Sequence, residues 1–83
     1  MHTLKMPTIL LLANMIKITI NPKDKHRFPH VHILHAEKSA LIDLKNFEVL
    51  ENNGFSMKTL KQVIAVIEDE QKFLLEAWRE YND

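Results

Sequence analysis

Histidines are concentrated in one short stretch of this chain, and they are its side chains best suited to chemistry. The chain has five His among 83 residues, and four of them lie between positions 26 and 35. His30 and His32 are two residues apart, so on a strand both side chains point to the same face. Such a pair can transfer protons near neutral pH or ligate a metal ion.

Metal-free phosphodiester cleavage, as in a ribonuclease, is one chemistry that this pair would support. His30 and His32 would act as base and acid, and Asp43 would orient His32. The chain shows no nucleophile motif, so a non-enzymatic role is favoured over catalysis. A basic loop before the pair would hold phosphate and attract RNA. The nucleic-acid-binding residues expected in this loop are Lys23, Lys25, His26 and Arg27.

A divalent metal site is the alternative use of the same side chains. Imidazole nitrogens and a carboxylate oxygen are ligands that zinc and nickel accept. The chain contains no Cys, which excludes a thiolate site. The ligands expected for this alternative are His26, His30, His32 and Glu48.

The composition limits the kinds of protein that carry these groups. With 83 residues, 46% of them hydrophobic and 27% charged, the chain is a small globular protein rather than a disordered or collagen-like one. Lys plus Arg equals Asp plus Glu at 11 each, so net charge predicts neither a nucleic acid nor a membrane as partner. The apolar stretch 8–16 is shorter than the roughly 20 residues that span a bilayer. We therefore expect a cytoplasmic protein with no membrane partner.

Five short strands are predicted to position the histidines. Residues 16–20 read Ile-Lys-Ile-Thr-Ile, a strict alternation that is typical of a half-buried strand. Residues 21–29 contain two prolines and no periodicity, which predicts a loop. The five expected strands cover residues 8–12, 16–20, 30–36, 39–44 and 47–51.

The last third of the chain is predicted to form one long helix. Apolar residues such as Leu60, Ile67 and Leu74 recur at helical spacing over 57–81. Ser56 is the expected N-cap. The sheet and the helix each have one apolar face, so each covers the other and the second sheet face is left to solvent or a partner. The predicted fold is α+β, with an antiparallel sheet of about five short strands and one C-terminal helix on one face.

Two tight turns would align polar side chains across this sheet. Two-residue turns at 37–38 and 45–46 set apolar residues opposite apolar residues on the core face. Neighbouring carboxylates would then repel on the other face, unless an imidazolium, a metal ion or water compensates them. The expected row of polar residues is His32, Asp43 and Glu48, with His30 on the same side.

The same register predicts an apolar strip beside the polar row. Leu34 would lie opposite Leu41, and Leu41 opposite Leu50, all pointing outward. Exposed apolar strips favour an interface. A small partner protein, or a second copy in a homodimer, is therefore expected here.

Four segments of the chain resemble one family of small bacterial proteins. They are the start Met6-Pro7-Thr8-Ile9, the motif His26-Arg27-Phe28-Pro29-His30-Val31-His32-Ile33, residues 40–44, and the helix end at Trp78. The family is domain-of-unknown-function family 4160, and the resemblance spans about residues 6–81. It implies a customary start at Met6, so residues 1–5 are expected to be a disordered leader and 6–83 a single α+β domain.

The resemblance also bears on site and partner. His26, His30, His32, Glu37 and Asp43 match positions of the family pattern, whereas Ala36 and Phe47 stand where members often have Gly. Members are often encoded beside a second small protein, in an arrangement similar to toxin–antitoxin pairs. The resemblance thus implies a protein that binds a small partner protein, with RNA as a second candidate partner. The alternatives are a homo-oligomerising interaction module and a His/carboxylate metal-binding protein.

Overall fold

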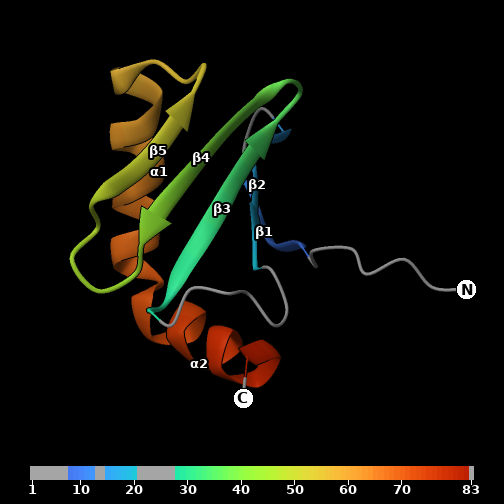
Figure 1. The fold of residues 1–83 in the computed structure, drawn as a ribbon, viewed down its shortest axis with the longest axis vertical. Helices are drawn as coiled ribbons and strands as arrows, with labels where there is room; N and C mark the ends of the chain where they lie inside the picture. Colours follow the sequence, from blue (N-terminus) through green and yellow to red (C-terminus); the bar gives the residue numbers. More distant parts are fainter. Residues whose placement is uncertain (1–7, 13–14, 21–27, 83) are drawn as a thin grey trace, which may run out of the picture.

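The computed structural model describes residues 8–12, 15–20 and 28–82, in which five strands precede two helices (Figure 1). The five strands form one antiparallel sheet in the order β1-β2-β3-β4-β5. The predicted α+β class and the five-stranded antiparallel sheet are confirmed. The elements are β1 Thr8–Leu11, β2 Lys17–Thr19, β3 His30–His35, β4 Lys38–Asp43, β5 Val49–Asn53, α1 Met57–Asp69 and α2 Gln71–Asn82.

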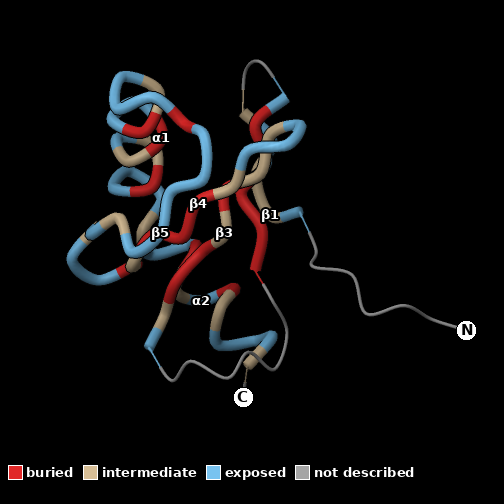
Figure 2. Tube along the Cα trace, turned by 45° about the horizontal axis from the view of Figure 1, so that its top comes forward, coloured by how far each residue is buried: buried red, intermediate tan, exposed pale blue. Residues whose placement is uncertain are grey.

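The helices cover one face and one end of the sheet. In Figure 1, α1 lies behind β4 and β5, and α2 passes below the end of the sheet at which β3 begins. Buried positions in Figure 2 follow the middle strands and the inward sides of both helices. Among the described helices, none is both long and apolar enough to cross a membrane. The central core residues include Ile18, Ile33, Ile42, Leu60, Ile67 and Leu74, each with no exposed surface.

The C-terminal segment bends, so the prediction of one helix over 57–81 is wrong. Glu70 alone separates α1 from α2. Helical hydrogen bonding continues across the bend, where the Leu74 N–H donates to the Glu70 carbonyl at 2.9 Å. Gln71 supplies a reason for the bend, because its Nε2 donates to the Leu44 carbonyl at 2.8 Å. A polar residue inside the apolar stripe thus ties the helix to the β4–β5 turn.

The start of α1 is as the sequence predicts. The Ser56 side chain accepts a hydrogen bond from the Thr59 N–H at 3.1 Å, so the N-cap is confirmed. Gly54, two residues earlier, has a φ of +106°, a conformation that other residues rarely adopt. A Cβ at Gly54 would also lie 2.9 Å from Lys38 Cγ. This glycine therefore permits both the turn and the close approach of Lys38.

The β3–β4 turn lies one residue earlier than predicted, at 36–37 instead of 37–38. The predicted pairing therefore slips by two positions. His32 lies opposite Leu41 rather than Asp43, and Asp43 lies opposite His30. An even slip leaves every side chain on its expected face, which is why the core prediction survives while the row of polar residues does not.

The β4–β5 connection is also longer than predicted. Ile42 lies opposite Val49, as expected, but a bulge follows between Leu41 and Ile42. Leu41 therefore faces Glu51 rather than Leu50. Strand β5 begins at Val49, so the predicted start of this strand at residue 47 is wrong.

Both turns contain a non-glycine residue in the left-handed region. Ala36 has a φ of +54° and Phe47 a φ of +62°. This conformation costs about 1–2 kcal/mol for a residue with a Cβ. These are the two positions at which the resembled family often has Gly. Met15, just before β2, is also left-handed, with a φ of +64°.

Candidate functional site

His30, the first residue of β3, is buried and fixed in orientation. Only 1% of its surface is exposed, and its Nδ1 lies 2.8 Å from the Phe28 carbonyl oxygen. A carbonyl oxygen only accepts hydrogen bonds, so Nδ1 carries the proton and donates it. This contact defines the tautomer of the ring and joins β3 to the segment that leads into it.

Three aromatic rings surround the His30 ring. Ring centroids lie 5.2 Å away for Phe28, 5.5 Å for His32 and 6.4 Å for Trp78, with tilted or edge-on geometry. These separations are typical of favourable aromatic pairs. Trp78 belongs to α2, so the bend at Glu70 has a consequence at this site: it leads the helix to the end of the sheet where His30 lies (Figure 1).

Asp43 holds the turn after β4. Its Oδ1 accepts hydrogen bonds from the Lys45 N–H at 2.7 Å and the Asn46 N–H at 3.1 Å. The side chain of Asn46 then accepts from the Glu48 N–H at 2.9 Å. These are local turn contacts of the kind that Asp and Asn form readily. The predicted opposition of His32 and Asp43 is absent, and this carboxylate oxygen organises the backbone instead.

Glu48 contacts Asp43 through a backbone hydrogen bond. The Asp43 N–H donates to the Glu48 carbonyl at 2.9 Å, although the two residues are not ladder partners. Within the described parts of the chain, no three His, Asp or Glu residues are placed to hold one metal ion. Of the predicted ligands, His26 lies outside the described residues. The metal site stays a prediction.

The basic loop also stays a prediction. Lys23, Lys25, His26 and Arg27 all fall outside the described residues, as does the predicted leader. The structure therefore places the histidines of β3 and the acidic residues near the β4–β5 turn, but it does not place the residues expected to bind phosphate.

The face of the sheet that points away from α1, here called the outer face, carries the predicted interface residues. Leu34 is half-buried, Leu41 is only 7% exposed and Leu50 is 36% exposed. The predicted row of three leucines is wrong, because Leu34 faces Ser39 and Leu41 faces Glu51. The first observed row is Leu11, Lys17, Leu34, Ser39 and Asn53, and the second is Thr8, Thr19, His32, Leu41 and Glu51.

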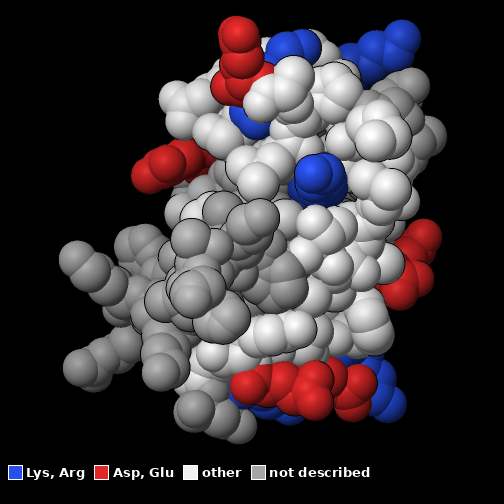
Figure 3. Space-filling view, turned by 90° about the vertical axis from the view of Figure 1, so that its right-hand side faces the viewer, with Lys and Arg blue, Asp and Glu red and all other residues white. Residues whose placement is uncertain are grey.

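The first of these rows is the more open. Leu11 is 57% exposed and Lys17 is exposed, whereas Thr19 and Leu41 of the second row are buried. Figure 3 views the molecule from the side of β1 and β2, where uncharged side chains surround a basic one and most acidic groups lie toward the rim. Leu11 is not among the predicted interface residues. A bulge in β1 turns it outward, opposite Lys17, and nothing in the sequence marks this bulge.

A shallow depression lies beside this row. It has a volume of about 200 Å³. Two of its lining residues are left-handed, namely Met15 just before β2 and Ala36 at the start of the β3–β4 turn. Its lining residues are Met15, Lys17, Leu34, His35 and Ala36.

Comparison with known proteins places most of the chain in one family. The family model described as a domain of unknown function (DUF4160) matches residues 15–79. No curated protein matches the chain, and no solved structure does. The match covers all the described elements except β1 and the last residues of α2.

Proposed function

The chain belongs to the DUF4160 family, and on that basis we propose that it is a non-catalytic module that binds a small partner protein. The surface that we assign to this role is the open row of the outer face, Leu11, Lys17 and Leu34, with the depression beside it. The depression is the observation that carries the proposal. Interfaces derive much of their affinity from a few side chains that fill such recesses.

The shape and chemistry of this surface limit what the partner presents. Leu34 and Met15 offer hydrocarbon to a side chain that enters the depression, and Leu11 extends the apolar area across β1. Lys17 lies between Leu11 and Leu34 in the row. A complementary partner has an aliphatic or aromatic side chain at the centre of its surface and a carboxylate next to it.

Two contacts favour binding over catalysis. The Nδ1 proton of His30 is donated to a carbonyl, and the ring is buried among aromatic side chains. Oδ1 of Asp43 accepts two backbone N–H groups of its own turn. Groups held in this way stabilise the fold, whereas a general acid or base needs access to substrate.

The partner that we propose is the second small protein encoded beside members of this family. This choice rests on the resemblance to toxin–antitoxin-like pairs. RNA is the second candidate partner, through the predicted residues Lys23, Lys25, His26 and Arg27. Binding to RNA would weaken steeply with salt, which separates it from a largely apolar protein interface.

Co-expression with the product of the adjacent gene tests the proposal. We expect light scattering to show a complex with one copy of each chain, and Leu34→Glu to weaken it about tenfold or more. Phe73→Glu is the matched control, because Phe73 is 47% exposed on α2, and α2 lies at the end of the sheet where β3 begins, whereas Leu34 is near the end of β3 (Figure 1). Circular dichroism would verify that both variants fold.

The result that contradicts the proposal is equally clear. A complex that survives Leu34→Glu and dissociates in Phe73→Glu would place the interface on α2. A dimer of this chain alone that Leu34→Glu dissociates would support the homo-oligomerising alternative instead.

A further inference from the structure

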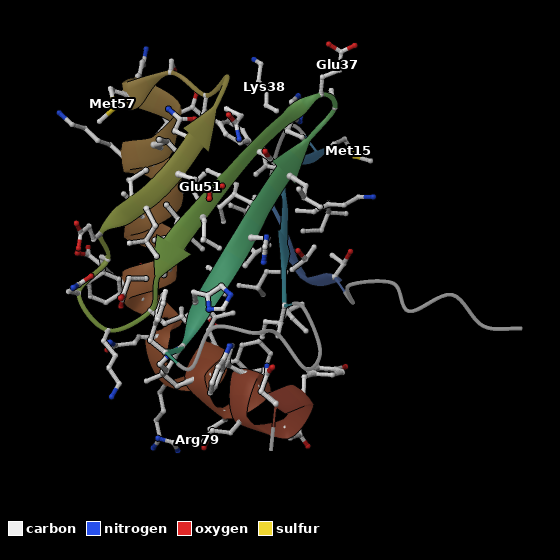
Figure 4. The ribbon with its side chains drawn as sticks, in the orientation of Figure 1. Met15, Glu37, Lys38, Glu51, Met57 and Arg79 are labelled. Carbon is white, nitrogen blue, oxygen red and sulfur yellow. The ribbon has the colours of Figure 1, made fainter. Side chains whose placement is uncertain are left out.

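A larger hollow lies at the end of the sheet opposite α2, on the side of the sheet that α1 covers. Its volume is about 480 Å³, which is within the range of small-molecule sites. Figure 4 shows Met15 and Lys38 at this end of the molecule, with Met57 at the start of α1. The hollow is lined by Met15, Ile16, His35, Lys38, Phe55, Thr59 and Gln62.

Three of the residues that line this hollow carry hydrogen-bond donors. Lys38 brings an ammonium group from the start of β4, and Gln62 brings an amide from α1. The Ser56 hydroxyl donates to Thr59 Oγ1 at 3.0 Å, so the hydroxyl hydrogen of Thr59 is directed elsewhere. Three different donor types therefore line one recess, which favours a ligand that accepts hydrogen bonds.

The electrostatics of the hollow favour an anion. No Asp or Glu is among its lining residues. The first turn of α1, which contributes Thr59, also has no acidic residue, so its backbone N–H groups add positive potential. No lining residue therefore neutralises the positive charge of Lys38.

His35 contributes an independent sign of an incomplete site. It lines both the large hollow and the depression on the outer face. Its Nδ1 is buried and has no hydrogen-bond partner among the residues that the structure describes. An unsatisfied buried nitrogen is unfavourable, and a polar ligand that bonds to it after a small rotation of the ring would remove that cost.

We propose that this hollow binds a small organic oxyanion that carries a short hydrocarbon group. Lys38, Thr59 and Gln62 donate hydrogen bonds to its oxygens. The hydrocarbon lies against the apolar wall, which consists of Met15, Ile16 and Phe55. A carboxylate and a phosphate monoester share this chemistry. The assigned donors are separate from the partner surface, because Lys38 and Thr59 do not belong to the outer-face row, although Met15 and His35 line both recesses.

Titrations followed by amide NMR test the proposal on the full chain. The probes are 3-methylbutanoate, butyl phosphate, inorganic phosphate and the neutral 3-methylbutanamide. We expect at least one organic anion to shift the signals of Lys38, Thr59 and Gln62 saturably, with the amide producing no such shift. The comparison of the two organic anions identifies the preferred headgroup.

Two charge-matched variants show whether the hollow is responsible. Lys38→Gln should weaken binding of the organic anion about tenfold or more, because it removes the ammonium donor. Lys61→Gln, on exposed α1 surface outside the hollow, should leave the affinity unchanged. Amide signals away from each substitution that match those of the wild type would show that both variants fold.

Several results would overturn the proposal. These are the absence of saturable shifts with both organic anions, or equal losses in the two variants. Binding of the neutral amide as tight as that of the anion would remove the role of charge. Binding of inorganic phosphate as tight as that of butyl phosphate would remove the role of the apolar wall.

Discussion

The ring centroids of His30 and Trp78 lie 6.4 Å apart, so the first residue of β3 packs against the last helix of the chain. His30 is 1% exposed and Trp78 is half-buried beside the core. This contact joins two segments that are distant in sequence. His30, which the sequence suggests for catalysis or metal binding, is therefore part of the packing between α2 and the sheet.

Removal of the Trp78 ring should therefore destabilise the fold. We expect Trp78→Ala to lower the free energy of unfolding by about 2–3 kcal/mol, since the half-buried indole covers His30. Trp78→Phe should cost less, because it keeps an aromatic ring and removes an Nε1 that is buried with no partner among the described residues. Urea unfolding measures both; equal losses in the two variants would contradict this role of the ring.

The bend between the helices should depend on Gln71. Gln71→Ala would leave the Leu44 carbonyl without this donor, and Leu44 has no exposed surface. The expected loss is about 1–2 kcal/mol in urea unfolding. Lys72→Ala, at an exposed neighbouring position, should stay within about 0.5 kcal/mol. A loss at Lys72 as large as at Gln71, although Ala favours the helix at both positions, would contradict the role of the hydrogen bond.

Glycine at position 36 should stabilise the protein. Ala36 is left-handed, and relief of this strain by Ala36→Gly is expected to add about 1 kcal/mol. The same substitution at Ala65, exposed within α1, should instead cost about 1 kcal/mol. Opposite signs in chemical denaturation are the predicted result, and destabilisation at both positions would contradict the assigned turn.

The Asp43 side chain should contribute to the free energy of unfolding through the hydrogen bonds that its Oδ1 accepts. Asp43→Ala removes the acceptor for the Lys45 and Asn46 N–H groups and should cost about 1 kcal/mol. Asp43→Asn keeps an acceptor oxygen and should stay close to wild type in thermal unfolding. If charge rather than hydrogen bonding mattered, both variants would lose the same amount.

Alternation and helical spacing were sufficient to predict the five strands, their order along the chain and the face of the core residues in β2, β3 and β4. They were insufficient to predict which residues face each other on neighbouring strands. One residue of error in the turn at Ala36 displaced His32 from Asp43 by two positions while leaving Val31 and Ile33 in the core. An Ala at a left-handed position gives no sign of the turn, whereas a Gly there would have marked it.

The remaining differences come from contacts between distant segments. The helix bend depends on the bond from Gln71 to Leu44, 27 residues away in sequence. The exposure of Leu11 depends on a bulge in β1 that no Gly or Pro indicates. The donors around the large hollow come from β4 and α1, and their proximity exists only in the folded chain.

Methyl NMR of the leucines, with the partner protein added, tests the proposed interface most directly. Leu11 and Leu34 flank Lys17 on the outer face, while Leu75 is half-buried on α2. We predict that the product of the adjacent gene shifts or broadens the methyl signals of Leu11 and Leu34 and leaves Leu75 unchanged. Perturbation of Leu75 with Leu11 and Leu34 unaffected would contradict the assignment of the outer face as the binding surface.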